Sequence, residues 1–114
     1  MKTAWIVALL LFATIASAIN DEQFDAIKQL GSLNGVALNC GYLNETHRMK
    51  RSLVSTVPKI RPIGIAFEQS TNEAFLAMIT AREACPSEKT IGKQVDERIE
   101  LLERAFINHQ EKLF

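Results

Sequence analysis

The fold of this chain is decided by the stretch EKTIGKQVDERIELLERAF, which runs from residue 88 to residue 106. Its large apolar side chains recur at spacings of three and four, at Ile91, Val95, Ile99, Leu102 and Phe106. This spacing places them along one face of an α-helix, with charged residues on the other faces. Ser87 precedes the stretch as a suitable N-cap, and Glu88 suits the positive end of the helix dipole. The stretch therefore predicts an amphipathic helix that packs against other helices.

Prolines divide the preceding residues into two more helical stretches. We expect the first from about residue 21 to residue 57, with Asn20 as its N-cap. Pro58 ends it, because the residue before a proline avoids helical geometry. After an extended connector at 58–62, we expect the second helix at 63–84. No alternation of apolar and polar residues with hairpin turns appears, so no strand is predicted.

Two sequence features qualify these helices. Gly31 and Gly35 each weaken a helix by roughly 1 kcal/mol relative to alanine. Either the first helix breaks there, or another helix packs closely against it. Ser70 and Glu73 have the spacing of a capping box, which predicts a restart or kink of the second helix at Ser70.

The first 18 residues have the three parts of a secretory signal peptide. Lys2 gives a basic start, residues 4–15 are apolar apart from Thr14, and 16–18 read Ala-Ser-Ala, a small-residue cleavage signature. The apolar run is too short to span a membrane. We therefore expect a signal peptide at 1–18 and a single helical domain at 19–114 that is periplasmic or secreted.

The predicted domain contains two cysteines, Cys40 and Cys85. In an oxidising compartment an isolated pair is expected to form a disulfide, whereas redox-active thiols usually occur as C-x-x-C. The bond would close a loop of about 45 residues and contribute roughly 4 kcal/mol through chain entropy. The predicted fold class is therefore all-α: a small bundle of three to four helices stapled by one disulfide.

Nothing in the sequence assembles a catalytic, cofactor or metal site. His47 has no H-x-x-x-H partner, and the glycines form neither a G-x-G-x-x-G nor a P-loop pattern. No haem motif and no serine in a nucleophile elbow is present. We therefore expect no enzyme activity, no cofactor and no metal. The sequence contains 13 basic residues (lysine plus arginine) and 13 acidic residues (aspartate plus glutamate). This balance of charge argues against nucleic-acid binding.

One charge asymmetry stands out, because no acidic residue lies between Glu45 and Glu68. Arg48 and Arg51 are three apart on one helical face. The stretch supplies the candidate binding residues, which are Arg48, Lys50, Arg51, Lys59 and Arg61. They predict a patch that faces an acidic protein or an anionic membrane surface. The alternative is a solvated face, or pairing with acids elsewhere in the fold.

The residues around the cysteines are similar to two groups of small periplasmic proteins. Cys40-Gly41-Tyr42-Leu43, and Ala84-Cys85 with Lys89 and the following helix, resemble the HdeA-like acid-stress chaperones. Cys40-Gly41-Tyr42 and Cys85-Pro86 are similar to cysteine contexts in immunity proteins against secreted cell-wall amidases. The first resemblance implies a dimer that opens at low pH, and the second implies a partner enzyme.

The sequence thus predicts a secreted or periplasmic, non-enzymatic protein-binding module, either inhibitor- and immunity-like or chaperone-like. Its partner would be another protein, acidic if the basic stretch contacts it, and a homodimer is compatible with this reading. The alternative is an envelope- or membrane-associated accessory protein that uses the basic face. Asn44 begins an N-glycosylation sequon, which matters only in a eukaryotic host.

Reduction of a Cys40–Cys85 disulfide should lower the free energy of unfolding by about 4 kcal/mol, because the unfolded chain regains the entropy of an open loop. Denaturant unfolding of the oxidised and reduced protein measures this difference. Thiol labelling of the denatured oxidised protein should find no free cysteine. Two labelled cysteines in protein made in an oxidising compartment would contradict the prediction.

Overall fold

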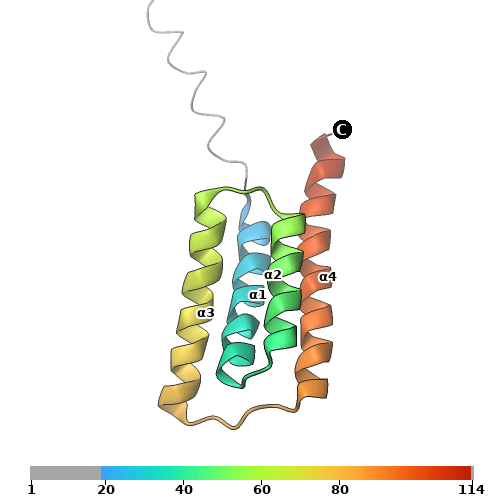
Figure 1. The fold of residues 1–114 in the computed structure, drawn as a ribbon. Coiled ribbons are helices and arrows are strands. Elements are labelled where there is room, and N and C mark those ends of the chain that lie inside the picture. Colours follow the sequence, from blue (N-terminus) through green and yellow to red (C-terminus); the bar gives the residue numbers. More distant parts are fainter. Residues whose placement is uncertain (1–18, 114) are drawn as a thin grey trace, which may run out of the picture.

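The chain folds as a bundle of four helices in a computed structural model that describes residues 19–113. The helices are α1 (Asp21–Asn39), α2 (Leu43–Thr56), α3 (Arg61–Ala81) and α4 (Glu88–Leu113), and Figure 1 shows their order. No strand occurs in this part of the chain, so the predicted all-α bundle is confirmed. The predicted signal peptide at 1–18 lies outside the described residues.

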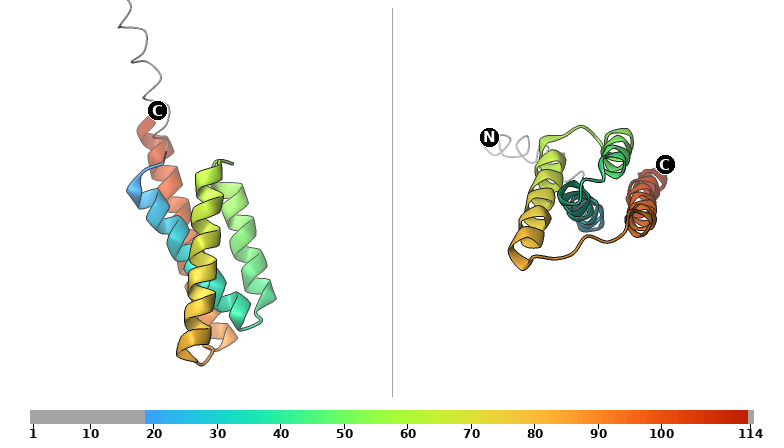
Figure 2. Two further views of the ribbon diagram at one scale, coloured as in Figure 1. Left: turned by 90° about the vertical axis from the view of Figure 1, so that its left-hand side faces the viewer. Right: turned by 60° about the horizontal axis from the view of Figure 1, so that its bottom comes forward.

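The helix α1 is the centre of the bundle. It packs against each of the other three helices, and α2 also packs against α4, as the end-on view in Figure 2 shows. No Cα atom of α2 lies within 8 Å of one in α3. The core gathers around α1 and takes in the predicted stripe of α4; its fully buried large side chains include Ile27, Leu30, Met49, Ile91, Val95 and Leu102.

The glycines of α1 lie at its contact with α3 and do not break the helix. A Cβ atom built on Gly35 would stand 2.3 Å from the carbonyl oxygen of Thr71, and one on Gly31 would stand 2.7 Å from that of Phe67. Real Cβ atoms do not approach backbone this closely, so only glycine fits at either position. Of the two alternatives that these glycines raised, close helix packing is confirmed and the break is wrong.

The predicted single helix over residues 21–57 is wrong, because the chain turns at Cys40–Tyr42. Gly41 has φ +76°, a left-handed conformation that favours glycine. The N–H of Tyr42 donates to the carbonyl of Ala37 at 2.9 Å, and the N–H of Gly41 donates to that of Leu38 at 3.2 Å. These two bonds form a Schellman motif, which ends α1 and lets α2 begin at Leu43.

The helix α3 differs from its prediction at both ends and in the middle. It begins at Arg61, because Pro62 is tolerated in a first helical turn, and it ends at Ala81 rather than at residue 84. Arg82 ends it in the left-handed conformation, with φ 53°. The predicted restart at Ser70 is wrong, since α3 is continuous there. Ser70 is buried against α1 beside Gly31 and keeps helical geometry, so its side chain does not cap.

Polar contacts and the disulfide fix the two ends of the bundle. At one end the predicted Cys40–Cys85 disulfide joins the α1–α2 turn to the α3–α4 loop, and the Cα atoms of the two cysteines are 5.7 Å apart. The Tyr42 hydroxyl donates to the carbonyl of Pro86 at 2.7 Å and holds the same two segments together. At the other end the buried Gln23 amide donates to the carbonyl of Ala105 at 3.3 Å, which ties α1 to α4.

Replacing Gly35 with alanine should destabilise the protein by about 1–3 kcal/mol, although alanine favours helix, because the methyl group collides with the backbone of α3. Gly64 of α3 is the matched control, since a Cβ there meets nothing within 4 Å. Gly64→Ala should stabilise by up to about 1 kcal/mol. Chemical denaturation measures both changes, and equal effects at the two positions would contradict the close packing of α1 and α3.

Candidate functional site

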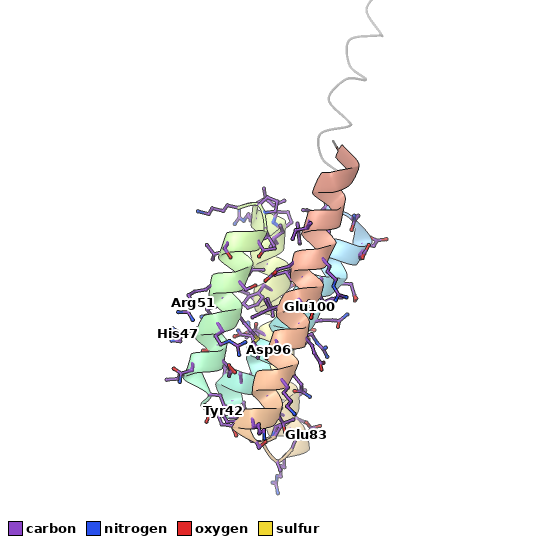
Figure 3. The ribbon with its side chains drawn as sticks, turned by 90° about the vertical axis from the view of Figure 1, so that its right-hand side faces the viewer. Tyr42, His47, Arg51, Glu83, Asp96 and Glu100 are labelled. Carbon is purple, nitrogen blue, oxygen red and sulfur yellow. A yellow bond between two sulfur atoms is a disulfide. The ribbon has the colours of Figure 1, made fainter. Side chains whose placement is uncertain are left out.

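The structure does not gather the five basic candidates into one patch. Arg48 turns toward α4, where its guanidinium pairs with Asp96 and also donates to Glu45 Oε1 at 2.7 Å. The hydrogen bond to Glu45 is the main cause that raises the pKa of Arg48, and the bond to Asp96 adds to it against the opposing effect of burial. Figure 3 shows His47 and Arg51 on the side of α2 that is turned away from Asp96. Arg48 therefore pairs with an acidic residue of another helix, which was the alternative to a binding patch.

The other four basic candidates are exposed and lie on three different segments. Lys50 and Arg51 are on α2, Lys59 is in the connector, and Arg61 begins α3. None of the four forms an ion pair with another residue of the described chain. Lys50 borders a recess of the surface. The basic stretch thus extends over α2, the connector and the start of α3, with Arg48 paired to Asp96 and Lys50 at the recess.

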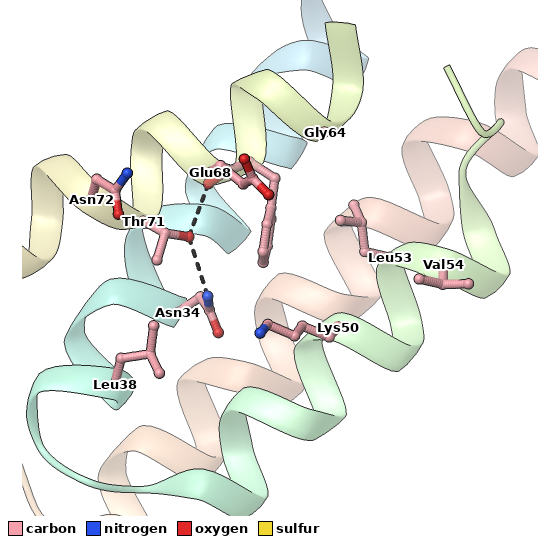
Figure 4. A pocket seen from close by; sticks show the side chains of 10 residues that line it. Asn34, Leu38, Lys50, Leu53, Val54, Gly64, Glu68, Thr71 and Asn72 are labelled. Carbon is pink, nitrogen blue, oxygen red and sulfur yellow. Dashed lines mark hydrogen bonds between the residues drawn. The ribbon is translucent and has the colours of Figure 1, made fainter. Parts of the chain in front are cut away.

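A groove between α2 and α3 is the candidate functional site. These two helices both flank α1 and have no Cα atoms within 8 Å of each other, and the groove between them has a volume of about 520 Å³. Leu53 and Val54 of α2 line one wall and Gly64 of α3 lines the other, as Figure 4 shows, and Leu38 of α1 also lines the groove. Phe67 of α3 lines it as well. Val54 is 60% exposed, so part of this apolar surface is open to water.

A hydrogen-bonded pair of polar residues forms the floor of the groove. Asn34 of α1 is 1% exposed, and its Nδ2 donates to Oγ1 of Thr71 on α3 at 3.2 Å. Thr71 Oγ1 lies 2.9 Å from the carbonyl oxygen of Phe67 and 3.0 Å from that of Gly31. The Asn34 Oδ1 atom is buried and has no hydrogen-bond partner among the described residues. A buried acceptor in this state costs about 1–3 kcal/mol.

Opposite charges border the groove. Lys50 projects from α2 and Glu68 from α3, and Figure 4 shows the Lys50 ammonium group pointing toward Asn34. The groove therefore offers apolar surface, one acceptor without a donor, one cation and one anion. In the part of the chain that the structure describes, no cluster of three histidine, cysteine or acidic side chains could hold a metal ion. This set of groups can bind and orient a ligand.

Sequence reasoning missed this site because its residues come from three helices that no motif connects. The one local signal was the pair Gly31 and Gly35, four residues apart on the face of α1 that carries Asn34 toward α3. That pair marks the close contact of α1 with α3, and the groove lies beside it, between α3 and α2.

The structure defines a small, disulfide-bonded all-α protein of four helices over residues 19–113. None of those helices has the length and apolar character to cross a membrane. The sequence matches no family model, and comparisons with the curated proteins and with the solved structures give no match either. The resemblances to acid-stress chaperones and to immunity proteins therefore stay predictions.

Replacing Arg48 with methionine should destabilise the protein by about 1–3 kcal/mol, because it leaves the Glu45 carboxylate, whose side chain is 8% exposed, without its donor. Asp96→Asn should cost less than about 1 kcal/mol, since the Asp96 side chain is 67% exposed and water screens the pair. Denaturant unfolding compares the two variants. Adding Glu45→Gln to Arg48→Met should recover part of the loss, and equal costs for the two single variants would contradict this account.

Proposed function

We propose that this chain is a non-enzymatic protein-binding module that works outside the cytoplasm, in the periplasm or after secretion. The disulfide supports an oxidising compartment, and the sequence of residues 1–18 supports export. The observation that carries the proposal is the groove between α2 and α3, where a folded helical scaffold leaves aliphatic side chains open to water beside a buried polar floor.

The shape of the groove favours a protein segment as the ligand. Its two walls are helices, and its floor is a third helix that contacts both of them. A helix with its side chains is about 10 Å across, and an amphipathic helix commonly binds by laying its apolar face into such a groove. A segment that covers Val54 and Leu53 would remove apolar surface from water at about 25 cal/mol per Å².

An envelope- or membrane-associated role is the second candidate. It is favoured by the exposed cations Arg51, Lys59 and Arg61, which have no ion pair with other described residues. Anionic lipid attracts basic residues near its surface by about 1 kcal/mol each. This attraction would be independent of the groove, so the two candidates can be separated by mutation.

The proposed function predicts that Val54→Glu abolishes capture of a protein partner, because it places a charge on the apolar wall of the groove. Leu43→Glu is the matched control: Leu43 is also on α2 and also 60% exposed, but it does not line the groove. Immobilised wild type and both variants would be incubated with an envelope extract of the source organism, and retained proteins identified by mass spectrometry. A protein retained by wild type and Leu43→Glu, and lost with Val54→Glu, supports the proposal.

The outcome that contradicts it is equal retention by all three proteins. Binding to vesicles of phosphatidylserine or phosphatidylglycerol tests the second candidate. If vesicle binding is lost with Arg51→Glu and Lys59→Glu and is unaffected by Val54→Glu, and the groove captures nothing, the membrane role replaces the protein-binding role. Circular dichroism of each variant establishes that the helices are intact.

A further inference from the structure

The unpartnered oxygen of Asn34 distinguishes this groove from the other recesses of the surface. Among described side chains, only Asn34 Oδ1 and Ser52 Oγ are buried polar atoms without a hydrogen-bond partner. A serine hydroxyl can rotate to donate to a carbonyl of its own helix. The Asn34 carboxamide has no such freedom, because its other half is already engaged with Thr71.

The contacts of Thr71 determine which atom of Asn34 is left unpartnered. The Thr71 hydroxyl has a single hydrogen, and its two other neighbours, the carbonyl oxygens of Phe67 and Gly31, can only accept. In the hydrogen-bond arrangement of the structure, the hydroxyl donates to a carbonyl and accepts from the amide nitrogen of Asn34. The Asn34 oxygen is left at the floor of the groove as an acceptor that lacks a donor.

We propose that the groove recognises an amphipathic helix of a partner protein whose central side chain, a serine, threonine, asparagine or glutamine, donates a hydrogen bond to Asn34 Oδ1. This inference rests on the proposed function and adds the chemistry of the partner. Local rules of folding are most often violated at functional sites, and a buried acceptor without a donor beneath an open groove is such a violation.

Charge complementarity defines the flanks of the partner helix. Lys50 on the α2 wall favours an acidic residue opposite it, and Glu68 on the α3 wall favours a basic one. In the free protein the Lys50 ammonium group points toward Asn34. When the partner helix binds, its acidic residue pairs with this ammonium group, and the donor at the centre of the helix reaches Oδ1, which has no partner in the free protein. The apolar face of the helix then covers Leu53 and Val54.

The probes are two designed helical peptides that match α2 in length. Both carry leucines on one face, glutamates on one flank and lysines on the other; the first has serine at the centre of the apolar face and the second has 2-aminobutyrate, which replaces the hydroxyl by a methyl group. Fluorescence anisotropy with the oxidised protein should show about tenfold tighter binding of the serine peptide, because the other leaves the acceptor unpaired.

The double variant Asn34→Leu, Thr71→Val replaces both polar groups of the floor by apolar groups of similar shape. It should remain as stable as wild type and bind the two peptides equally, because the acceptor is gone. Thr80→Val is the control, since Thr80 also donates to a carbonyl four residues earlier in α3 but lies outside the groove. This control should keep the preference for the serine peptide.

Equal binding of both peptides to wild type, or no binding of either, overturns the inference. A preference that survives in the double variant overturns it as well, because the donor then contacts another group. If Val54→Glu still abolishes partner capture in these cases, the protein-binding function stands without this specificity. If sedimentation shows a dimer of the free chain that Val54→Glu dissociates, a second copy occupies the groove and the inference is wrong.

Discussion

The close contact between the backbones of α1 and α3 is the constraint on which the rest of the structure depends. Gly31 and Gly35 let α3 approach until a Cβ atom would stand 2.3 Å from a carbonyl oxygen. This approach places the Thr71 hydroxyl within reach of both Asn34 and the carbonyl of Gly31. No Cα atom of α3 lies within 8 Å of one in α2, and the space between these two helices is the groove. This packing feature thus accounts for the floor of the candidate site and for the position of its α3 wall against α1.

The helix α3 packs only against α1, so the rest of its placement depends on its connections. At one end the Cys40–Cys85 disulfide and the Tyr42–Pro86 hydrogen bond hold the α3–α4 loop against the α1–α2 turn. At the other end a short connector from α2 leads into the first turn of α3, which contains Pro62. The disulfide therefore supports the site as well as the stability of the fold, since loosening the loop would release the end of α3 nearest to it.

The elements that sequence reasoning located well are those whose signals are local. Pro58 ends α2 because proline restricts the residue before it, and Ser87 caps α4 by accepting from the N–H of Thr90 at 3.2 Å. The errors came where two local signals compete. Gly41 ends a helix, whereas Gly31 and Gly35 lie where α1 packs against α3, and the residue type alone does not separate these two roles. Ser70 has the spacing of an N-cap but is buried in a continuous helix.

For the candidate site, the basic stretch was contiguous along the chain, but helix α2 points Arg48 toward Asp96 and Lys50 toward the groove.

By itself the sequence determined that the protein is all-α, that its last helix buries the stripe from Ile91 to Phe106, and that Cys40 and Cys85 pair. These properties depend on the helical period and on the number of cysteines, both of which can be read along the chain. Only the tertiary structure decided which helices touch, which glycine turns the chain, and that Asn34 keeps an acceptor without a donor. Those outcomes depend on distances between residues that are far apart along the chain, 37 positions for Asn34 and Thr71 and 82 for Gln23 and Ala105, and such distances are set by packing.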